Sequence, residues 1–225
     1  MKVYYYDDSE AHIADFKRDH PSVKSILVRN AVPNPILKGM DSFYYPTLYN
    51  RKYPHNKFAT ALMQNHDILH PKKRHPAEVC NVCQNVFRSG LTIPEIRRIA
   101  KRKADAVLFD WDFTLSSANG LSGYDMEEGT HTEVAQYFAG TMERFKALRE
   151  MFTELRRRGT KVFILSDNGL AQEHRAHDLL SVAQILDSEL KAEDIVYGNG
   201  EKAKVFATDK RFQPYRTSRK TRKRR

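Results

Sequence analysis

The chain of 225 residues is 40% hydrophobic and 11% aromatic, which is enough for one sizeable core with an accessory segment or for two small domains. No apolar run approaches the roughly 20 residues of a membrane-spanning helix, and acids stand at Asp7 and Asp8, where a signal peptide would need its apolar region. We therefore expect an intracellular protein with no membrane partner, and its two cysteines are too few for a disulfide scaffold.

The net charge of +10 is concentrated near the C-terminus. Residues 210–225 contain nine of the 38 lysines and arginines and no acid, so the rest of the chain has 29 cations against 28 acids and is nearly neutral. A segment so basic and so poor in apolar residues is predicted to be disordered, and we assign 213–225 as a basic tail. The tail either only improves solubility or binds a polyanion or an import receptor, and the second alternative is compatible with a nuclear location.

The first 28 residues are predicted to form a strand, a helix and a second strand, over 3–6, 10–20 and 23–28. Ser9 is a suitable N-cap for the helix, and Pro21 would stop it. Residues 29–91 follow. They are rich in proline, asparagine, tyrosine and histidine and have no sustained hydrophobic period, so we predict an irregular accessory segment that serves as a lid or a zinc site.

Residues 92–212 alternate between helical and strand patterns and are predicted to form the core of the fold. Helices are expected over 93–103, from Thr130 and Glu133 (a capping box) to about 158, over 170–186 and from Lys202 onward; strands are expected over 105–110, 161–166 and 194–198. This alternation predicts an α/β fold with a Rossmann-like parallel sheet and an irregular insertion.

Polar residues suited to phosphoryl transfer follow four of the predicted strands, and the carboxyl ends of parallel strands are where such sheets bind ligands. Carboxylates hold Mg²⁺ through their oxygens, and one of them can attack phosphorus. A hydroxyl and an ammonium can stabilise the phosphoryl oxygens as charge develops. The residues are Asp7 and Asp8, Asp110 and Asp112, Ser166 with Asn168, and Lys202.

This set of residues resembles the haloacid dehalogenase (HAD) superfamily, in particular its phosphatases with an aspartate nucleophile. The first family motif, DxDx[TV] after a hydrophobic strand, matches Asp110-Trp111-Asp112-Phe113-Thr114. The second motif, a Ser or Thr at a strand end, matches Ser166 in "VFILSDNG". The resemblance implies a HAD-type sheet and a magnesium-dependent phosphatase.

The two remaining family motifs are a lysine that opens a helix and an acidic pair after a strand. Lys202 in "GNGEKAKVF" is the best match for the lysine, with Lys204 as second choice, and Asp7-Asp8 in "VYYYDDSEAHI" matches the acidic pair. In the family the acidic pair comes last along the chain, whereas here it comes first. We therefore infer a circular permutation, in which the strand at 3–6 lies beside the strand at 105–110 and the strand at 23–28 lies outside it at the sheet edge.

The resemblance also implies a role for each matched residue. By this resemblance Asp110 is the nucleophile and a Mg²⁺ ligand, and Asp112 is the general acid/base and a ligand through its backbone carbonyl. Thr114 supports the turn, and Ser166 and Lys202 bind the phosphoryl group. Asp7 or Asp8 is the acid that completes the metal shell.

The expected function is hydrolysis of a phosphate monoester through an aspartyl phosphate. The connection over 116–131 is too short for a large cap domain, which favours a bulky substrate such as a phosphoprotein or a polynucleotide end. The alternative is a catalytically weak HAD-like scaffold that binds nucleic acid or a partner protein.

A second possible metal site lies within the accessory segment. Cys80 and Cys83 have CxxC spacing, and His66, His70 and His75 precede them. Two thiolates and two imidazoles would suit tetrahedral zinc. The alternative is a pair of reduced cysteines with surface histidines in an irregular loop.

Overall fold

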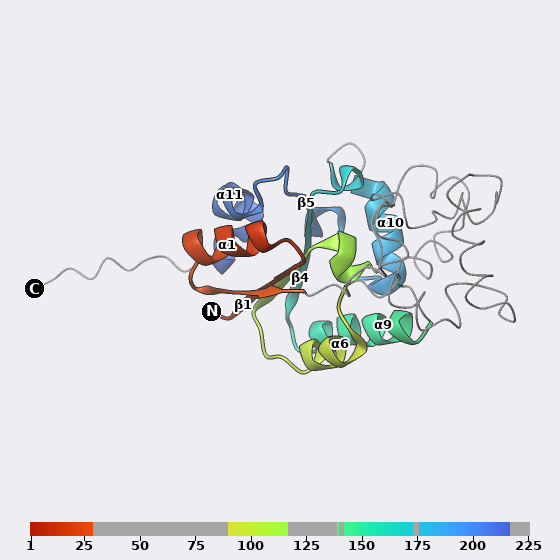
Figure 1. The fold of residues 1–225 in the computed structure, drawn as a ribbon. Helices are drawn as coiled ribbons and strands as arrows, with labels where there is room; N and C mark the ends of the chain where they lie inside the picture. The colour runs from red at the N-terminus through yellow and green to blue at the C-terminus, as the bar shows by residue number, and fades with distance from the viewer. Residues whose placement is uncertain (29–89, 117–138, 140–141, 173–175, 217–225) are drawn as a thin grey trace, which may run out of the picture.

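The structure is a computed structural model, and it describes residues 1–28, 90–116, 139, 142–172 and 176–216 (Figure 1). The predicted zinc segment with Cys80 and Cys83, the capping box at Thr130 and Glu133, and the last nine residues of the basic tail lie outside the described residues.

Helices and strands alternate through the described chain, as the sequence predicts. In chain order they are β1 (Val3–Asp7), α1 (Glu10–Asp19), β2 (Val23–Leu27), α6 (Ile93–Ala100), β3 (Ala106–Phe109), the irregular turn η3 (Trp111–Leu115), α9 (Met142–Arg157), β4 (Lys161–Ser166), the 3₁₀ turns η4 (Gly169–Ala171) and η6 (Ala192–Asp194), which flank α10 (Ala176–Leu186), then β5 (Ile195–Tyr197), α11 (Lys202–Thr208) and the 3₁₀ helix η7 (Lys210–Tyr215).

Five strands form one parallel sheet in the order β2-β1-β3-β4-β5. β1 pairs with β3 in the register Val3↔Ala106 to Tyr6↔Phe109, about a hundred residues apart in the sequence. The predicted placement of the first strand beside 105–110, with the second strand at the sheet edge, is therefore confirmed, as is the α/β class with an all-parallel sheet.

The two faces of the sheet are covered by different helices (Figure 1). Alternate strand residues such as Tyr4, Tyr6 and Phe109 contribute to a core with residues of α6, α9 and α10, whereas Tyr5 and Leu108 contribute to a second core with α1, α11 and η7. This alternation follows from the two-residue period of a strand. A sheet covered on both faces explains why its central strands have continuous apolar runs.

Two predicted helices differ in extent from those observed. The helix expected over 93–103 ends at Ala100. The helix expected over 170–186 is an α-helix only from Ala176, since Gly169–Ala171 form a 3₁₀ turn. The reason for the second difference is local: the Asn168 side chain accepts a hydrogen bond from the Leu170 backbone N–H and starts this separate turn.

The folded core extends beyond the boundaries of 92 and 212 that the sequence suggested. Leu91 is buried in the larger core. At the other end, η7 continues to Tyr215, whose ring packs edge-on against Phe163, and the Arg216 guanidinium donates to the Phe206 carbonyl at 2.7 Å. Residues 213–216 therefore belong to the fold and not to a disordered tail, because an aromatic ring and a cap for α11 hold them in place.

Candidate active site

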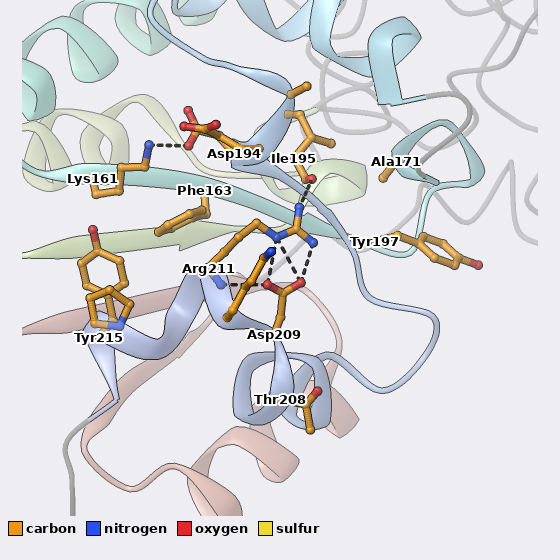
Figure 2. A pocket seen from close by; sticks show the side chains of 14 residues that line it. Lys161, Phe163, Ala171, Asp194, Ile195, Tyr197, Thr208, Asp209, Arg211 and Tyr215 are labelled. Atoms are coloured by element: carbon orange, nitrogen blue, oxygen red, sulfur yellow. Dashed lines mark hydrogen bonds and ion pairs between the residues drawn. The ribbon is translucent and has the colours of Figure 1, made fainter.

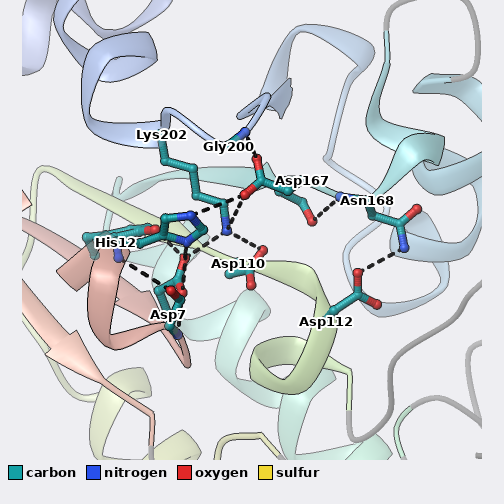
Figure 3. Close-up of polar contacts among 11 residues, drawn as sticks. Asp7, His12, Asp110, Asp112, Asp167, Asn168, Gly200 and Lys202 are labelled. Carbon is teal, nitrogen blue, oxygen red and sulfur yellow. Dashed lines mark hydrogen bonds and ion pairs between the residues drawn. The ribbon is translucent and has the colours of Figure 1, made fainter. Parts of the chain in front are cut away.

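Two buried aspartates meet at the carboxyl edge of the sheet (Figure 3). Asp7 is the last residue of β1, and Asp110 directly follows β3, which pairs with β1. Both side chains are buried, at 0% and 5% residue exposure. Burial of two carboxylates is costly unless cations or hydrogen-bond donors hold them. The groups around Asp7 and Asp110 therefore determine the charge and the possible chemistry of this site.

Lys202 supplies the cation. Its Nζ lies 2.7 Å from Asp7 Oδ2 and 2.8 Å from Asp110 Oδ1. The residue is 2% exposed and opens α11 directly after the loop that follows β5. Lys204, the second candidate, instead points to solvent and pairs with Glu201. Of the two lysines, Lys202 is therefore the one that reaches the carboxylates.

Asp7 is held by several donors besides Lys202. Its Oδ1 accepts from the Ser9 backbone N–H at 2.7 Å, and its Oδ2 accepts from the Tyr5 hydroxyl. The Nδ1 of His12 lies 3.3 Å from Oδ2. Burial alone would raise the pKa of Asp7, but the hydrogen bond from His12 and the charge of Lys202 outweigh it and lower the pKa to about 2.

Asp110 is in a different electrostatic state, although it contacts the same lysine. Burial raises the pKa of Asp110 to about 7; Lys202 opposes this shift, and the charge of Asp7 adds to it. For Lys202, burial lowers the pKa, but Asp110 and Asp7 outweigh it and hold the pKa above its usual value. The ammonium therefore stays charged, and burial disfavours the ionised form of Asp110 far more than that of Asp7.

A third carboxylate, Asp8, completes an acidic cluster. One oxygen of each of Asp7, Asp8 and Asp110 lies within 4.8 Å of the others. Three carboxylate oxygens at this separation are a donor set that suits Mg²⁺. The residues present therefore fit the metal that the sequence motifs imply, and the predicted proximity of the acidic pair to Asp110 is observed.

The chain turns sharply after Asp110. Phe113 adopts a left-handed backbone conformation with φ 52°, and the Ser116 backbone N–H closes the turn on the Trp111 carbonyl at 2.8 Å. In this turn Asp112 Oδ2 accepts from Asn168 Nδ2 at 3.0 Å, which connects the turn to the loop after β4. Asp112 is therefore directed toward the β4 end of the site.

The two remaining predicted residues are buried beside this turn. Ser166 ends β4, and its hydroxyl accepts a hydrogen bond from the Asn168 backbone N–H at 3.2 Å. Thr114 lies within the turn and is also buried; its carbonyl accepts from the Leu91 N–H at 2.9 Å. Thr114 therefore supports the turn through its backbone, and Ser166 lies at the strand end where the sequence placed it.

Sequence reasoning missed two residues of this cluster. The Nε2 of His12 lies 3.3 Å from Asp167 Oδ2, and the same oxygen is 3.9 Å from Lys202 Nζ. The other oxygen of Asp167 accepts from the Gly200 backbone N–H at 2.8 Å. The available signals were weak: His12 lies in the first turn of a capped helix after Asp7, and Asp167 directly follows Ser166.

A buried arginine stabilises the turn that follows Asp110. Arg144 of α9 donates to the carbonyls of Leu91, Ala139 and Thr114 at 2.8, 3.0 and 3.1 Å. Burial lowers the pKa of its guanidinium to about 9. Gly90, with φ +86°, packs so closely here that a Cβ would lie 2.7 Å from the Thr114 carbonyl. The guanidinium therefore ties three separate chain segments together next to the turn.

A large cleft lies at a different place, beside the edge strand β5 and η7 (Figure 2). It has a volume of about 1100 Å³. Two of its cations pair with acids of the same lining: Lys161 with Asp194 at 2.5 Å, and Arg211 with Asp209, while Arg211 also donates to the Ile195 carbonyl. Asp7, Asp110 and Lys202 are not among the residues that line this cleft, so it does not coincide with the carboxylate cluster.

Comparison of the chain with protein-family models, curated proteins and solved structures gives no match. Within the described ranges, the helices are too short or too polar to cross a membrane. The functional argument therefore depends on the geometry of the carboxylate cluster.

Proposed function

We propose that the protein is a magnesium-dependent phosphatase of HAD type, with a circularly permuted sheet, that hydrolyses a phosphate monoester through an aspartyl phosphate on Asp110. The observation that supports this function best is the position of Lys202 between Asp7 and Asp110, next to three clustered carboxylates at the carboxyl ends of β1 and β3. A structural ion pair would need only one acid for one lysine. Here one ammonium contacts two buried acids beside a third, and a divalent cation would offset the remaining negative charge.

The chemical steps follow from these positions. An Asp110 oxygen attacks phosphorus, the bond between phosphorus and the ester oxygen breaks, and Asp112 gives a proton to the leaving oxygen. Water then attacks the aspartyl phosphate, Asp112 takes a proton from that water, and inorganic phosphate leaves with Asp110 restored. Lys202 and Ser166 hold phosphoryl oxygens as charge develops. When bound, Mg²⁺ supplies positive charge that offsets the clustered carboxylates and the phosphoryl group.

The proposed ligands of the ion are Asp110, Asp112 and one or both of Asp7 and Asp8. The connection over 116–131 is short in the sequence, which favours a bulky substrate, either a phosphoprotein or a polynucleotide end.

The test is a phosphatase panel with p-nitrophenyl phosphate, phosphopeptides and 5′- or 3′-phosphorylated oligonucleotides, with and without Mg²⁺. We expect turnover that needs the metal and is abolished in Asp110→Asn, which keeps the shape of the side chain but removes the attacking charge. Asp15→Asn is the control, because this acid is exposed on α1 and pairs with Arg18.

Two results would oppose the proposal. Equal turnover in wild type and Asp110→Asn would mean that Asp110 is not the nucleophile. An absence of turnover on every substrate, with and without metal, would favour the alternative of a HAD-like scaffold that binds nucleic acid or a partner protein.

A further inference from the structure

His12 and Asp167 form a bridge over the ammonium of Lys202 (Figure 3). The two ring nitrogens of His12 contact different carboxylates: Nδ1 lies 3.3 Å from Asp7 Oδ2, and Nε2 lies 3.3 Å from Asp167 Oδ2. Asp167 is in turn fixed by the Gly200 backbone N–H, two residues before Lys202. One imidazole thus connects α1, the loop after β4 and the loop that leads into α11.

The carboxylates that this bridge contacts are also close to Lys202. Three acids lie near the ammonium: Asp7 at 2.7 Å, Asp110 at 2.8 Å and Asp167 at 3.9 Å. His12 contacts Asp7 and Asp167, the two acids of this group that are not the proposed nucleophile, and so offsets part of their negative charge beside the ammonium. Asp110 has no such contact with His12 among the described interactions, and Lys202 is the cation that contacts it.

We infer that His12 is a positioning residue that, with Asp167, orients Asp7 as a metal ligand and holds Lys202 against Asp110. This inference rests on the proposed function. Residues that orient metal ligands from behind typically change activity or metal affinity by about 10–100-fold when they are replaced. His12 does not touch Asp110 and therefore acts through Asp7 and Lys202.

The geometry allows each half of the bridge to be removed separately. His12→Asn places an amide nitrogen near the position of Nδ1 and retains a donor to Asp7, whereas His12→Gln places one near Nε2 and retains a donor to Asp167. His12→Ala removes both. We expect His12→Ala to lower kcat by about 10–100-fold with little change in KM, because the lost orientation matters in the transition state, and the two amide variants to recover part of that loss.

Asp167 provides a thermodynamic cycle. In Asp167→Ala both carboxylate oxygens are removed, so the contact with His12 Nε2 is lost, together with the acceptor for the Gly200 N–H. Because His12→Asn breaks the same contact, the double variant should lose no more activity than the more impaired single variant. Fully additive losses would show that the two residues do not act through their contact, and would overturn the inference.

The control is a second histidine–aspartate pair, His177 with Asp178 on α10, at 2.9 Å and with His177 79% exposed. His177→Ala should leave kcat and KM unchanged. If His12→Ala keeps the wild-type kcat, the inference is wrong. It is also wrong if His12→Asn, His12→Gln and His12→Ala lose stability and activity to the same extent, because that pattern indicates a purely structural histidine.

A readout without turnover separates this inference from the proposed function. The only tryptophan of the chain, Trp111, lies between Asp110 and Asp112, so its fluorescence can report binding of MnCl₂ or MgCl₂. Saturable binding that weakens by about 10–100-fold in His12→Ala would support the positioning role even if no ester is hydrolysed. Equal affinity in wild type and His12→Ala, or no binding to the wild type, would overturn it.

Discussion

Replacement of Lys202 by methionine tests whether one buried ammonium holds the candidate site together. Methionine has a similar length and no charge, so the variant leaves Asp7 and Asp110 buried without the cation that lies within 2.8 Å of each. Removal of one partner of a buried ion pair typically costs about 3–5 kcal/mol. Protonation of Asp110, whose pKa is already raised to about 7, limits the loss, so the decrease should not exceed this range.

The measurement is thermal and denaturant unfolding of wild type and Lys202→Met at neutral pH with EDTA. A loss of about 3–5 kcal/mol corresponds to a decrease in Tm of about 6–20 °C for a protein of this size. Lys204→Met is the matched control on the same helix, because its partner Glu201 is exposed and such pairs contribute about 0–1 kcal/mol. Equal stability of Lys202→Met and Lys204→Met would refute the reasoning, since it would mean that the carboxylates do not depend on Lys202.

Three further predictions concern pH, the buried arginine and the tail. Because the pKa of Asp110 is raised to about 7, its contribution to the stability of the metal-free protein is full in acid and is lost as pH rises through about 7. Metal binding, in contrast, needs the ionised form of Asp110. The increase in Tm on adding MgCl₂ should therefore be larger at about pH 8 than at about pH 6. Arg144→Met should destabilise the fold by several kcal/mol in denaturant unfolding, because three buried carbonyls lose a donor, while Arg149→Met should change it little; equal effects would contradict the bracing role. Deletion of residues 217–225 should leave p-nitrophenyl phosphate turnover unchanged and weaken oligonucleotide binding most at low salt, and unchanged binding would limit the tail to solubility or import.

The sequence was sufficient to predict the order of the elements and the residues at the strand ends. Strand and helix periods are local, so "VYYY", "AVLF" and "KVFILS" show their class without knowledge of their neighbours. Asp7 and Asp110 could be predicted as site residues because parallel strands bring their carboxyl ends to one edge. The expected pairing of β1 with β3 came from the order of the motifs and not from any periodicity.

Tertiary structure alone decided how the charges are paired. That Lys202 and not Lys204 lies between the aspartates depends on how α11 packs beside α1, which no local pattern encodes. The same is true of the His12–Asp167 bridge, whose members come from α1 and from the loop after β4, 155 positions apart in the sequence. In the sequence, Arg144 is one more cation on an amphipathic helix, and only the packed structure shows that it is buried against three carbonyls. Interactions of this kind are decided by distances of a few ångströms between distant segments, and these are fixed only when the sheet is assembled.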